Sequence, residues 1–497
     1  MPVDVSVVIA TYNTGPKLEP LLASLASQSL PADRYEVLVV DDGSTDDTWE
    51  RLQAATERMG NLRIERIPNS GWPGRPRNVG TDLAQGRYVF YSDHDDEFFP
   101  EALARMVAYA DETDADLLIG KEIRAGALGV GQEMFLADRP RADLFEDHVL
   151  SLMTPHRLFR TSFLREQGIR FPEGKRRLED HVLLAEVYTR TDRIAVLGSY
   201  PCYRWIIYPD QSNNSAELGD PRLFFDSLAD VFDVLDAAEI SDQRRDDLYR
   251  FWYASRMLKR LSWRWFSRWD EAYRDDVIEV IRDLAARRVP DRVDADLEPV
   301  YRRRAALLRA GNVEGLVDQA LADHQVHLRV DSCSVGWTGA GLRIDVSGTL
   351  ADRNDEAVPF AGEDADLKGA QVDLFLRQRP SGVEWYAAGS ATFVPTRQGE
   401  TTVLTATTSY VVDPATFVFG EPLDPGVWAV FLHARALGYD NRRALHDAAA
   451  GAADVDGLTV VSAVDREQRS VLRVSRSVPS PRPGLLRRVV RRARMGA

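Results

Sequence analysis

One stretch decides the fold of the N-terminal part of this chain: residues 69–98, Asn-Ser-Gly-Trp-Pro-Gly-Arg-Pro-Arg-Asn-Val-Gly-Thr-Asp-Leu-Ala-Gln-Gly-Arg-Tyr-Val-Phe-Tyr-Ser-Asp-His-Asp-Asp-Glu-Phe. It predicts a loop rich in glycine and proline that carries Arg75 and Arg77, then a short helix over 79–84. A β-strand over 88–91 follows and ends in Asp93-His94-Asp95-Asp96. Arginines suit phosphate, and carboxylates suit a hard divalent cation. The stretch therefore predicts a site for a metal-bound diphosphate.

Strands and helices alternate before this stretch. Apolar, β-branched runs over 5–10, 35–40 and 62–67 predict strands, and residues 18–27 and 48–59 have helical spacing. Their short connections indicate an α/β domain with a parallel sheet. Such sheets bind ligands at the carboxyl ends of their strands. The polar residues that follow predicted strands should therefore meet at one edge: Thr11, Tyr12, Asn13, Asp41, Asn69 and Asp93.

Composition excludes several classes of protein. A net charge of −15 over 497 residues is unfavourable for nucleic-acid binding, which needs a basic face. Two distant cysteines, Cys202 and Cys333, favour a reducing compartment without a disulfide framework. The sequence shows no signal peptide and no apolar run near the ~18–20 residues of a spanning helix. We expect a cytoplasmic protein.

Asp93 and Asp95 are the predicted metal ligands. Residues two apart on an extended strand point the same way, so both carboxylates should reach one ion. Mg²⁺ or Mn²⁺ prefers such oxygen ligands and would stabilise a leaving diphosphate. A capped turn before a helix shows the same Asp-x-Asp pattern, but the strand end and the neighbouring arginines favour the metal.

Two further residues near the predicted edge are candidates for nucleotide binding. Asp41 can accept a hydrogen bond from a base or a ribose hydroxyl, or it can cap the next helix. Arg77 can bind phosphate through two N–H groups, or it can be an ordinary surface residue. Neither the glycine pattern of dinucleotide-binding folds nor a phosphate-binding P-loop is present.

Glu179 and Asp180 open a predicted helix beside Lys175, Arg176 and Arg177. Asp180 can act as a general base that deprotonates an acceptor hydroxyl. Alternatively, both acids only pair with the positive end of the helix dipole. A single base together with a metal-bound leaving group implies inversion. Glycosidases differ, because there a second carboxyl protonates the departing oxygen.

The rest of the chain changes periodicity twice. Residues 221–322 read as helices in which tryptophans alternate with arginines, as around Trp252, Arg256, Arg260 and Trp265. We favour an amphipathic helix packing its aromatics on the first domain over a basic, aromatic groove for a sugar-phosphate polymer. From 326 the period is two, with strands over 327–330, 342–346, 371–377, 401–412, 427–435, 458–463 and 471–474. This predicts a β-sandwich with a structural or oligomerising role, and glycan binding is the alternative.

The C-terminal tail is basic, and no acid follows Glu467. Apolar residues of 485–493 fall on one helical face, opposite several arginines. An amphipathic helix on an anionic membrane surface would use Arg487, Arg488, Arg491 and Arg492. A solvated basic tail explains the same residues equally well.

At these motifs the sequence resembles the family 2 glycosyltransferases of GT-A fold. The resemblance rests on residues 5–13, 39–46, 76–80, 93–96 and 179–180. It extends to the poly(ribitol phosphate) N-acetylglucosaminyltransferases of wall teichoic acid through residues 69–78, 154–161 and 171–180. It covers residues 1–215 well, the helical segment loosely and the β part only by architecture.

The resemblance implies a role for each matching residue. Thr11, Tyr12, Asn13, Asp41, Asn69, Arg77 and Asp93 would contact UDP, Asp95 with Asp93 would hold Mn²⁺ or Mg²⁺, and Asp180, beside Glu179, would be the base. Arg160, Lys175, Arg176 and Arg177 would face a phosphate-bearing acceptor.

We therefore predict an α/β GT-A catalytic domain (1–215), a helical linker (216–325), a β-sandwich (326–475) and a basic amphipathic tail (476–497). The predicted activity is inverting, metal-dependent transfer from a UDP-sugar, with UDP-GlcNAc favoured, to a cell-envelope polymer such as teichoic acid. The enzyme could be a homo-oligomer on the inner face of the membrane. The alternatives are another polysaccharide acceptor, or a non-catalytic glycan-binding or envelope-assembly protein.

Overall fold

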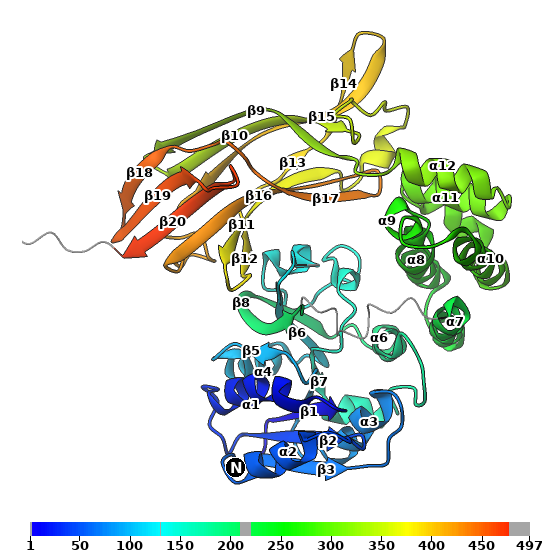
Figure 1. Cartoon of the computed structure of the whole chain (residues 1–497), viewed down its shortest axis with the longest axis vertical. Helices are drawn as coiled ribbons and strands as arrows, with labels where there is room; N and C mark the ends of the chain where they lie inside the picture. The colour runs from blue at the N-terminus through cyan, green and yellow to red at the C-terminus, as the bar shows by residue number, and fades with distance from the viewer. Residues whose placement is uncertain (1, 130, 209–219, 477–497) are drawn as a thin grey trace, which may run out of the picture.

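The computed structural model describes residues 2–129, 131–208 and 220–476. An α/β domain, a helical region and a β domain follow one another along the chain, and the helices lie at one side, between the two other parts (Figure 1). The predicted boundary at 215 and residues 477–497 of the predicted tail lie outside the described residues. The domain limits and the membrane role of the tail therefore stay predictions.

One mixed sheet forms the centre of the α/β domain, with strand order β3-β2-β1-β4-β7-β6-β8-β5. Its strands are β1 (Val5–Thr11), β2 (Tyr35–Asp41), β3 (Leu62–Arg66), β4 (Tyr88–Ser92), β5 (Glu97–Phe98), β6 (Leu117–Ala125), β7 (Leu158–Arg160) and β8 (Ile194–Ile206). The parallel sheet predicted for β1 to β4 is confirmed. It does not extend through the whole domain, because the short strand β7 runs antiparallel to both β4 and β6.

Helices cover both faces of this sheet, and alternate strand residues enter different cores. The helices are α1 (Leu18–Ala26), α2 (Thr48–Thr56), α3 (Gly74–Leu83), α4 (Ala102–Thr113), α5 (Thr161–Glu166) and α6 (Glu179–Arg190). Val7 and Ile9 of β1 pack in the core that includes α1 and α4. Val8, between them, faces a second core that contains α6. Burial on both faces explains why β1 is apolar throughout.

The second core continues into the helical region without a break. That region holds α7 (Pro221–Ala237), α8 (Asp242–Trp252), α9 (Trp263–Phe266), α10 (Glu271–Arg288), α11 (Pro299–Arg309) and α12 (Val313–Ala322). Trp252, Tyr253 and Phe266 are buried in the shared core, so the favoured interpretation of the aromatic pattern is confirmed. Among the described helices, none combines the length and the apolar character needed to cross a bilayer.

The β domain consists of two antiparallel sheets around one core, as the period-two pattern predicts. One sheet has the order β14-β15-β10-β9, and the other has the order β12-β11-β16-β20-β19-β18 with β13 on β11 and β17 on β16. The strands are β9 (His327–Thr338), β10 (Gly341–Ala351), β11 (Gln371–Arg379), β12 (Glu384–Tyr386), β13 (Ala391–Thr392), β14 (Val394–Gln398), β15 (Thr401–Val412), β16 (Gly426–Ala436), β17 (Tyr439–Ala444), β18 (Gly451–Val455), β19 (Leu458–Val464) and β20 (Ser470–Arg476). An oligomerising role for this domain stays a prediction.

Candidate functional site

The carboxyl ends of β1, β2 and β4 lie side by side. Thr11 pairs with Asp41 across β1 and β2, and Ile9 pairs with Ser92, the residue before Asp93. The edge expected from the sequence therefore exists, and it brings these polar residues together. The Oγ1 atom of Thr11 is buried and has no hydrogen-bond partner among the described residues, as expected of a group that meets a ligand.

Two asparagines hold the loops at this edge. Asn13 adopts a positive φ of 49°, and its Oδ1 accepts a hydrogen bond from Thr45 N at 2.8 Å. Asn69 Nδ2 donates to the carbonyl of Asp42 at 2.9 Å. Tyr12 is 47% exposed, so its ring is available to stack on a planar group.

Asp41 does not cap the following helix. It is fully buried and accepts hydrogen bonds from Ser44 N at 3.2 and 3.3 Å. Arg66 Nε lies 3.1 Å from Asp41 Oδ2, an oxygen that also accepts from Ser44 N. The cap of α2 is Asp47, which removes the structural alternative for Asp41.

Arg77 is the centre of the site, in a position that the sequence pattern did not predict. Helix α3 begins at Gly74, not at 79, so Arg77 lies on its first turn and is 4% exposed. Its guanidinium donates to Asp180 at 2.8 Å, to Glu179 at 3.3 Å and to Asp93 at 2.8 Å. The predicted position of Arg77, on a loop before the helix, is therefore wrong. Its terminal nitrogens pair with carboxylates, and its predicted contact with phosphate stays a prediction.

Asp180 has the properties of a general base. Burial and the charge of Glu179 raise its pKa to about 7, although Arg77 opposes them. A carboxylate with a pKa near neutrality binds a proton much more readily than an ordinary aspartate. Its side chain keeps 25% exposure, whereas Glu179 is more enclosed and accepts a hydrogen bond from Trp72 Nε1 at 2.9 Å.

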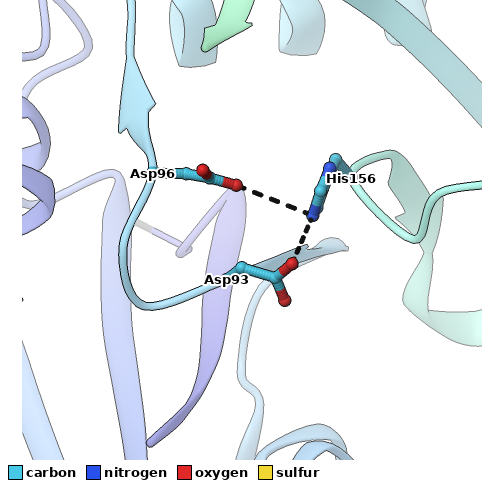
Figure 2. A group of neighbouring side chains, drawn as sticks. All are labelled: Asp93, Asp96 and His156. Carbon is cyan, nitrogen blue, oxygen red and sulfur yellow. Dashed lines mark hydrogen bonds and ion pairs between the residues drawn. The ribbon is translucent and has the colours of Figure 1, made fainter. Parts of the chain in front are cut away.

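Asp93 faces a histidine that sequence reasoning did not assign (Figure 2). His156 Nε2 lies 3.2 Å from Asp93 Oδ2, and Nδ1 lies 3.0 Å from Glu122 Oε2. Burial disfavours the charged ring, but these two carboxylates hold the pKa of His156 well above its ordinary value. Burial likewise acts against the charge of Asp93, yet His156 and Arg77 hold the pKa of that carboxyl well below its usual range. The only signal in the sequence was Thr154-Pro155-His156, a motif of the resemblance.

The geometry predicted for the metal ligands is also wrong. Strand β4 ends at Ser92, and residues 94–95 form a turn, so Asp93 and Asp95 do not lie on one extended strand. Ligand atoms of Asp93, Asp96 and His156 instead lie within 4.8 Å of one another. Asp96 already accepts hydrogen bonds from Tyr203 Oη and Ile206 N, both at 2.8 Å.

Asp95 fits the chemistry of a metal ligand better than His156 does. A charged imidazole that donates from both nitrogens has no lone pair for a cation. Asp95, in contrast, makes no ion pair with any residue of the described ranges, and burial and the charge of Asp93 raise its pKa. A desolvated carboxylate with no direct ion pair favours a bound cation, although His94 and Lys17 partly offset the charge of Asp95, and Mg²⁺ or Mn²⁺ suits its oxygen.

The predicted basic group is only partly correct. Arg160 pairs in register with Tyr88, at the opposite end of β4 from Asp93, and binds Asp114 at 2.7 Å. Its grouping with Lys175, Arg176 and Arg177 is therefore wrong. Those three precede α6, where Arg176 lies 3.2 Å from Asp230 and Arg177 stacks over Trp72 at 5.9 Å.

Comparison with known proteins identifies the domains. Residues 6–163 match the model of glycosyl transferase family 2, and residues 221–320 match the glycosyl transferase TarS linker domain. The chain carries a family 2 glycosyltransferase domain.

Relatives of this glycosyltransferase domain act on a phosphate polymer, according to their names. The chain is 31% identical to poly(ribitol-phosphate) beta-glucosyltransferase of Bacillus spizizenii over 48% of its own length and 38% of that protein's. It is 31% identical to poly(ribitol-phosphate) beta-N-acetylglucosaminyltransferase TarS of Staphylococcus aureus over 49% of its length and 42% of that protein's. The chain thus matches less than half the length of these relatives.

Solved structures agree with the GT-A fold. The crystal structure of S. aureus TarS 1–349 in complex with UDP-GlcNAc is 26% identical, with a TM-score of 0.59, over 73% of this chain and all of that one. The structure of S. aureus TarS is 21% identical, with a TM-score of 0.57, over 96% of this chain and 86% of that one, and supports the fold alone. The GT-A domain, helical linker and antiparallel β domain predicted from the sequence are confirmed.

Replacing Arg77 by methionine tests its central place. Arg77→Met leaves three acids without their shared cation, so the free energy of unfolding should fall by about 3–5 kcal/mol at pH 7. The deficit should shrink towards pH 5, because protonation of the carboxyls left without a cation removes their unpaired charges in the variant. Urea unfolding at both pH values measures this.

The matched control is Arg170→Met, which removes a bidentate pair with Asp82 on the surface. It should cost less than about 1 kcal/mol. Equal losses for the two variants, or a deficit for Arg77→Met that does not change with pH, would contradict the account.

Proposed function

We propose that this chain is an inverting, metal-dependent glycosyltransferase that moves a sugar from a UDP-sugar to an anionic cell-envelope polymer. UDP-GlcNAc is the favoured donor, and a teichoic acid of the poly(ribitol phosphate) type is the favoured acceptor. The observation that carries this proposal is the carboxyl of Asp180, whose pKa burial raises to about 7. Arg77 holds this side chain in place and also binds Asp93. The names of the two relatives and the UDP-GlcNAc complex of TarS supply the choice of donor and acceptor.

The donor half of the site is the edge formed by β1, β2 and β4. We assign contacts with UDP to the residues at this edge, namely Thr11, Tyr12, Asn13, Asp41, Asn69 and Asp93. The buried, unpartnered Oγ1 of Thr11 and the exposed ring of Tyr12 support this assignment. Arg77 contributes indirectly, because it fixes Asp93 and Asp180 rather than reaching the phosphates itself.

In the reaction, Asp180 accepts the proton of an acceptor hydroxyl as its oxygen attacks the anomeric carbon. The bond from that carbon to the diphosphate oxygen breaks, and UDP departs with the bonding electrons. Attack opposite the leaving group inverts the anomeric centre. Glu179 is less suited to this role because Trp72 also engages its carboxylate and its side chain is 10% exposed, against 25% for Asp180. A divalent cation held by Asp95, with Asp93 beside it, would neutralise the departing diphosphate.

The acceptor half lies where α6 meets the linker. Lys175, Arg176 and Arg177 precede Asp180, and Arg256 Nε lies 3.4 Å from His181, the residue after it. Burial lowers the pKa of Arg256 to about 10, and burial with the charges of Arg256 and Arg177 lowers that of Arg260 to about 9. In the described ranges neither Arg256 nor Arg260 makes an ion pair, so these two members of the cluster carry positive charge that no neighbouring acid balances. Such a cluster favours a polyanionic acceptor.

The release of UDP by the full chain tests the proposal. UDP-GlcNAc, UDP-glucose and UDP-galactose are each supplied with Mn²⁺ and with either poly(ribitol phosphate) or a neutral polysaccharide. We expect turnover that requires a UDP-sugar and the anionic polymer, is fastest with UDP-GlcNAc, and stops when the metal is chelated. High salt should weaken use of the polymer, because it screens the basic cluster.

Asp180→Asn should lower this turnover by at least about 10²-fold, while Asp192→Asn, on the exposed loop after α6, should not. Turnover with only the neutral polymer would mean that the acceptor is another polysaccharide and not a teichoic acid. The absence of both UDP release and a UDP-induced thermal shift would reject the enzyme and favour a glycan-binding protein.

The pH profile tests the base separately. Asp180 must be deprotonated to accept a proton, so kcat/KM should decrease as the pH falls below about 7, the pKa of this carboxyl. Measurement from pH 5 to 9 should show that decrease in the unaltered protein and not in the residual activity of Asp180→Asn. A profile that stays flat down to pH 5 would rule out a base with a raised pKa.

A further inference from the structure

Strand β6 contacts the site residues on one face and the β domain on the other. Side chains alternate across a strand, and Lys121 and Ile123 point to the β domain whereas Glu122, between them, points to His156. The Nζ atom of Lys121 lies 3.8 Å from the ring centroid of Trp385 in β12. Ile123 is 1% exposed and belongs to the core of the β domain. Figure 1 shows β12 next to β6 and β8 at this junction.

Side chains of the β domain also form hydrogen bonds with backbone atoms at the end of β6 and just after it. Arg377 of β11 donates to the carbonyl of Arg124 at 2.9 Å and also to the carbonyl of Ala127. Glu384 of β12 accepts a hydrogen bond from Gly129 N at 3.0 Å. The residues on both sides of Glu122 are therefore held by the β domain, although Glu122 itself faces the catalytic centre.

A second anchor lies eleven residues after Glu122, at Glu133. This acid is 8% exposed, and three basic side chains of the β domain surround it: His433 at 3.1 Å, Arg442 at 2.9 Å and Arg435 at 3.5 Å. We call these residues the Glu133 cage. Its neighbour Gln132 donates to the backbone carbonyl of Glu122 at 2.9 Å. The cage thus fixes a side chain that supports Glu122 directly.

From Glu122 the contacts continue to the reacting groups. Its Oε2 accepts from Thr154 Oγ1 at 2.9 Å and lies 3.0 Å from His156 Nδ1. His156 meets Asp93, Asp93 meets Arg77, and Arg77 meets Asp180. The first step, between Glu122 and His156, is fully buried, so a shift of Glu122 moves the ring that contacts Asp93.

We propose that Glu122 is a positioning residue for the nucleotide site, and that the β domain keeps it in place through β6 and the Glu133 cage. The docked β domain would then increase the affinity of the donor site for the nucleotide. This inference rests on the proposed function, because it assigns UDP to the site that contains Asp93. Supporting partners of a binding carboxylate or histidine are commonly worth about 10–100-fold in affinity or activity.

The test is the dissociation constant of UDP in the presence of Mn²⁺, measured by calorimetry on the full chain. Glu122→Gln should weaken UDP binding about ten-fold with little change in the thermal unfolding temperature. Thr154→Val, which removes one hydrogen bond and keeps the shape, should weaken it less but in the same direction. With donor at saturation, kcat of Glu122→Gln should change less than the KM for UDP-sugar.

The contribution of the β domain is tested by Arg442→Gln, which opens the cage. Its matched control is Arg379→Gln, since Arg379 pairs with Asp465 inside the β domain. Arg442→Gln should weaken UDP binding, and Arg379→Gln should not. In the double variant with Glu122→Gln the two effects should not multiply, because both act through Glu122.

Three outcomes would overturn the inference. Unchanged UDP binding in both Glu122→Gln and Thr154→Val removes the positioning role. Multiplying effects of Arg442→Gln and Glu122→Gln, or equal effects of Arg442→Gln and Arg379→Gln, remove the link to the β domain. If the unaltered protein does not bind UDP, the proposed function fails and this inference fails with it.

Discussion

The site depends on a single buried cation among three carboxylates. Asp93, Glu179 and Asp180 come from two segments far apart in the chain, and without Arg77 their charges would repel one another in a region with little water. The guanidinium is well suited because it is planar and presents several N–H groups in fixed directions. It joins the first turn of α3 to the end of β4 and to the start of α6. The end of β4 at Asp93 and the carboxyl of Asp180 are thereby parts of one hydrogen-bonded unit.

The helical linker and the β domain contact the surroundings of this hydrogen-bonded unit from different sides. The linker shares a core with the sheet and places Trp252 against His181, whose Nδ1 accepts from the indole at 3.1 Å. The β domain contacts the opposite wall, β6, and encloses Glu133. Both parts therefore contact residues that neighbour the acids of the site. Contacts from all three parts of the chain therefore surround the site residues.

Local patterns in the sequence predicted what local forces determine. The strands of the β domain were found because a period of two reports burial on one face, and the edge residues Thr11, Asp41 and Asn69 followed from strand ends. Predictions failed where distant contacts decide: α3 begins at Gly74, the turn after Ser92 separates Asp93 from Asp95, and Arg160 pairs with Asp114. His156 meets Asp93 across 63 positions. No spacing rule connects such residues, because only the order of strands in the sheet brings them together.

The central claim is that Asp180 activates an acceptor oxygen for direct displacement of UDP. The anomeric configuration of the product tests it most directly, because the sugar of UDP-GlcNAc is α-linked and a single displacement must invert it. Proton NMR of the first product formed from UDP-GlcNAc and poly(ribitol phosphate) distinguishes the two configurations by the coupling of the anomeric proton. The account predicts a β-linked sugar. An α-linked product would contradict it, since retention requires a second displacement or attack from the face of the leaving group.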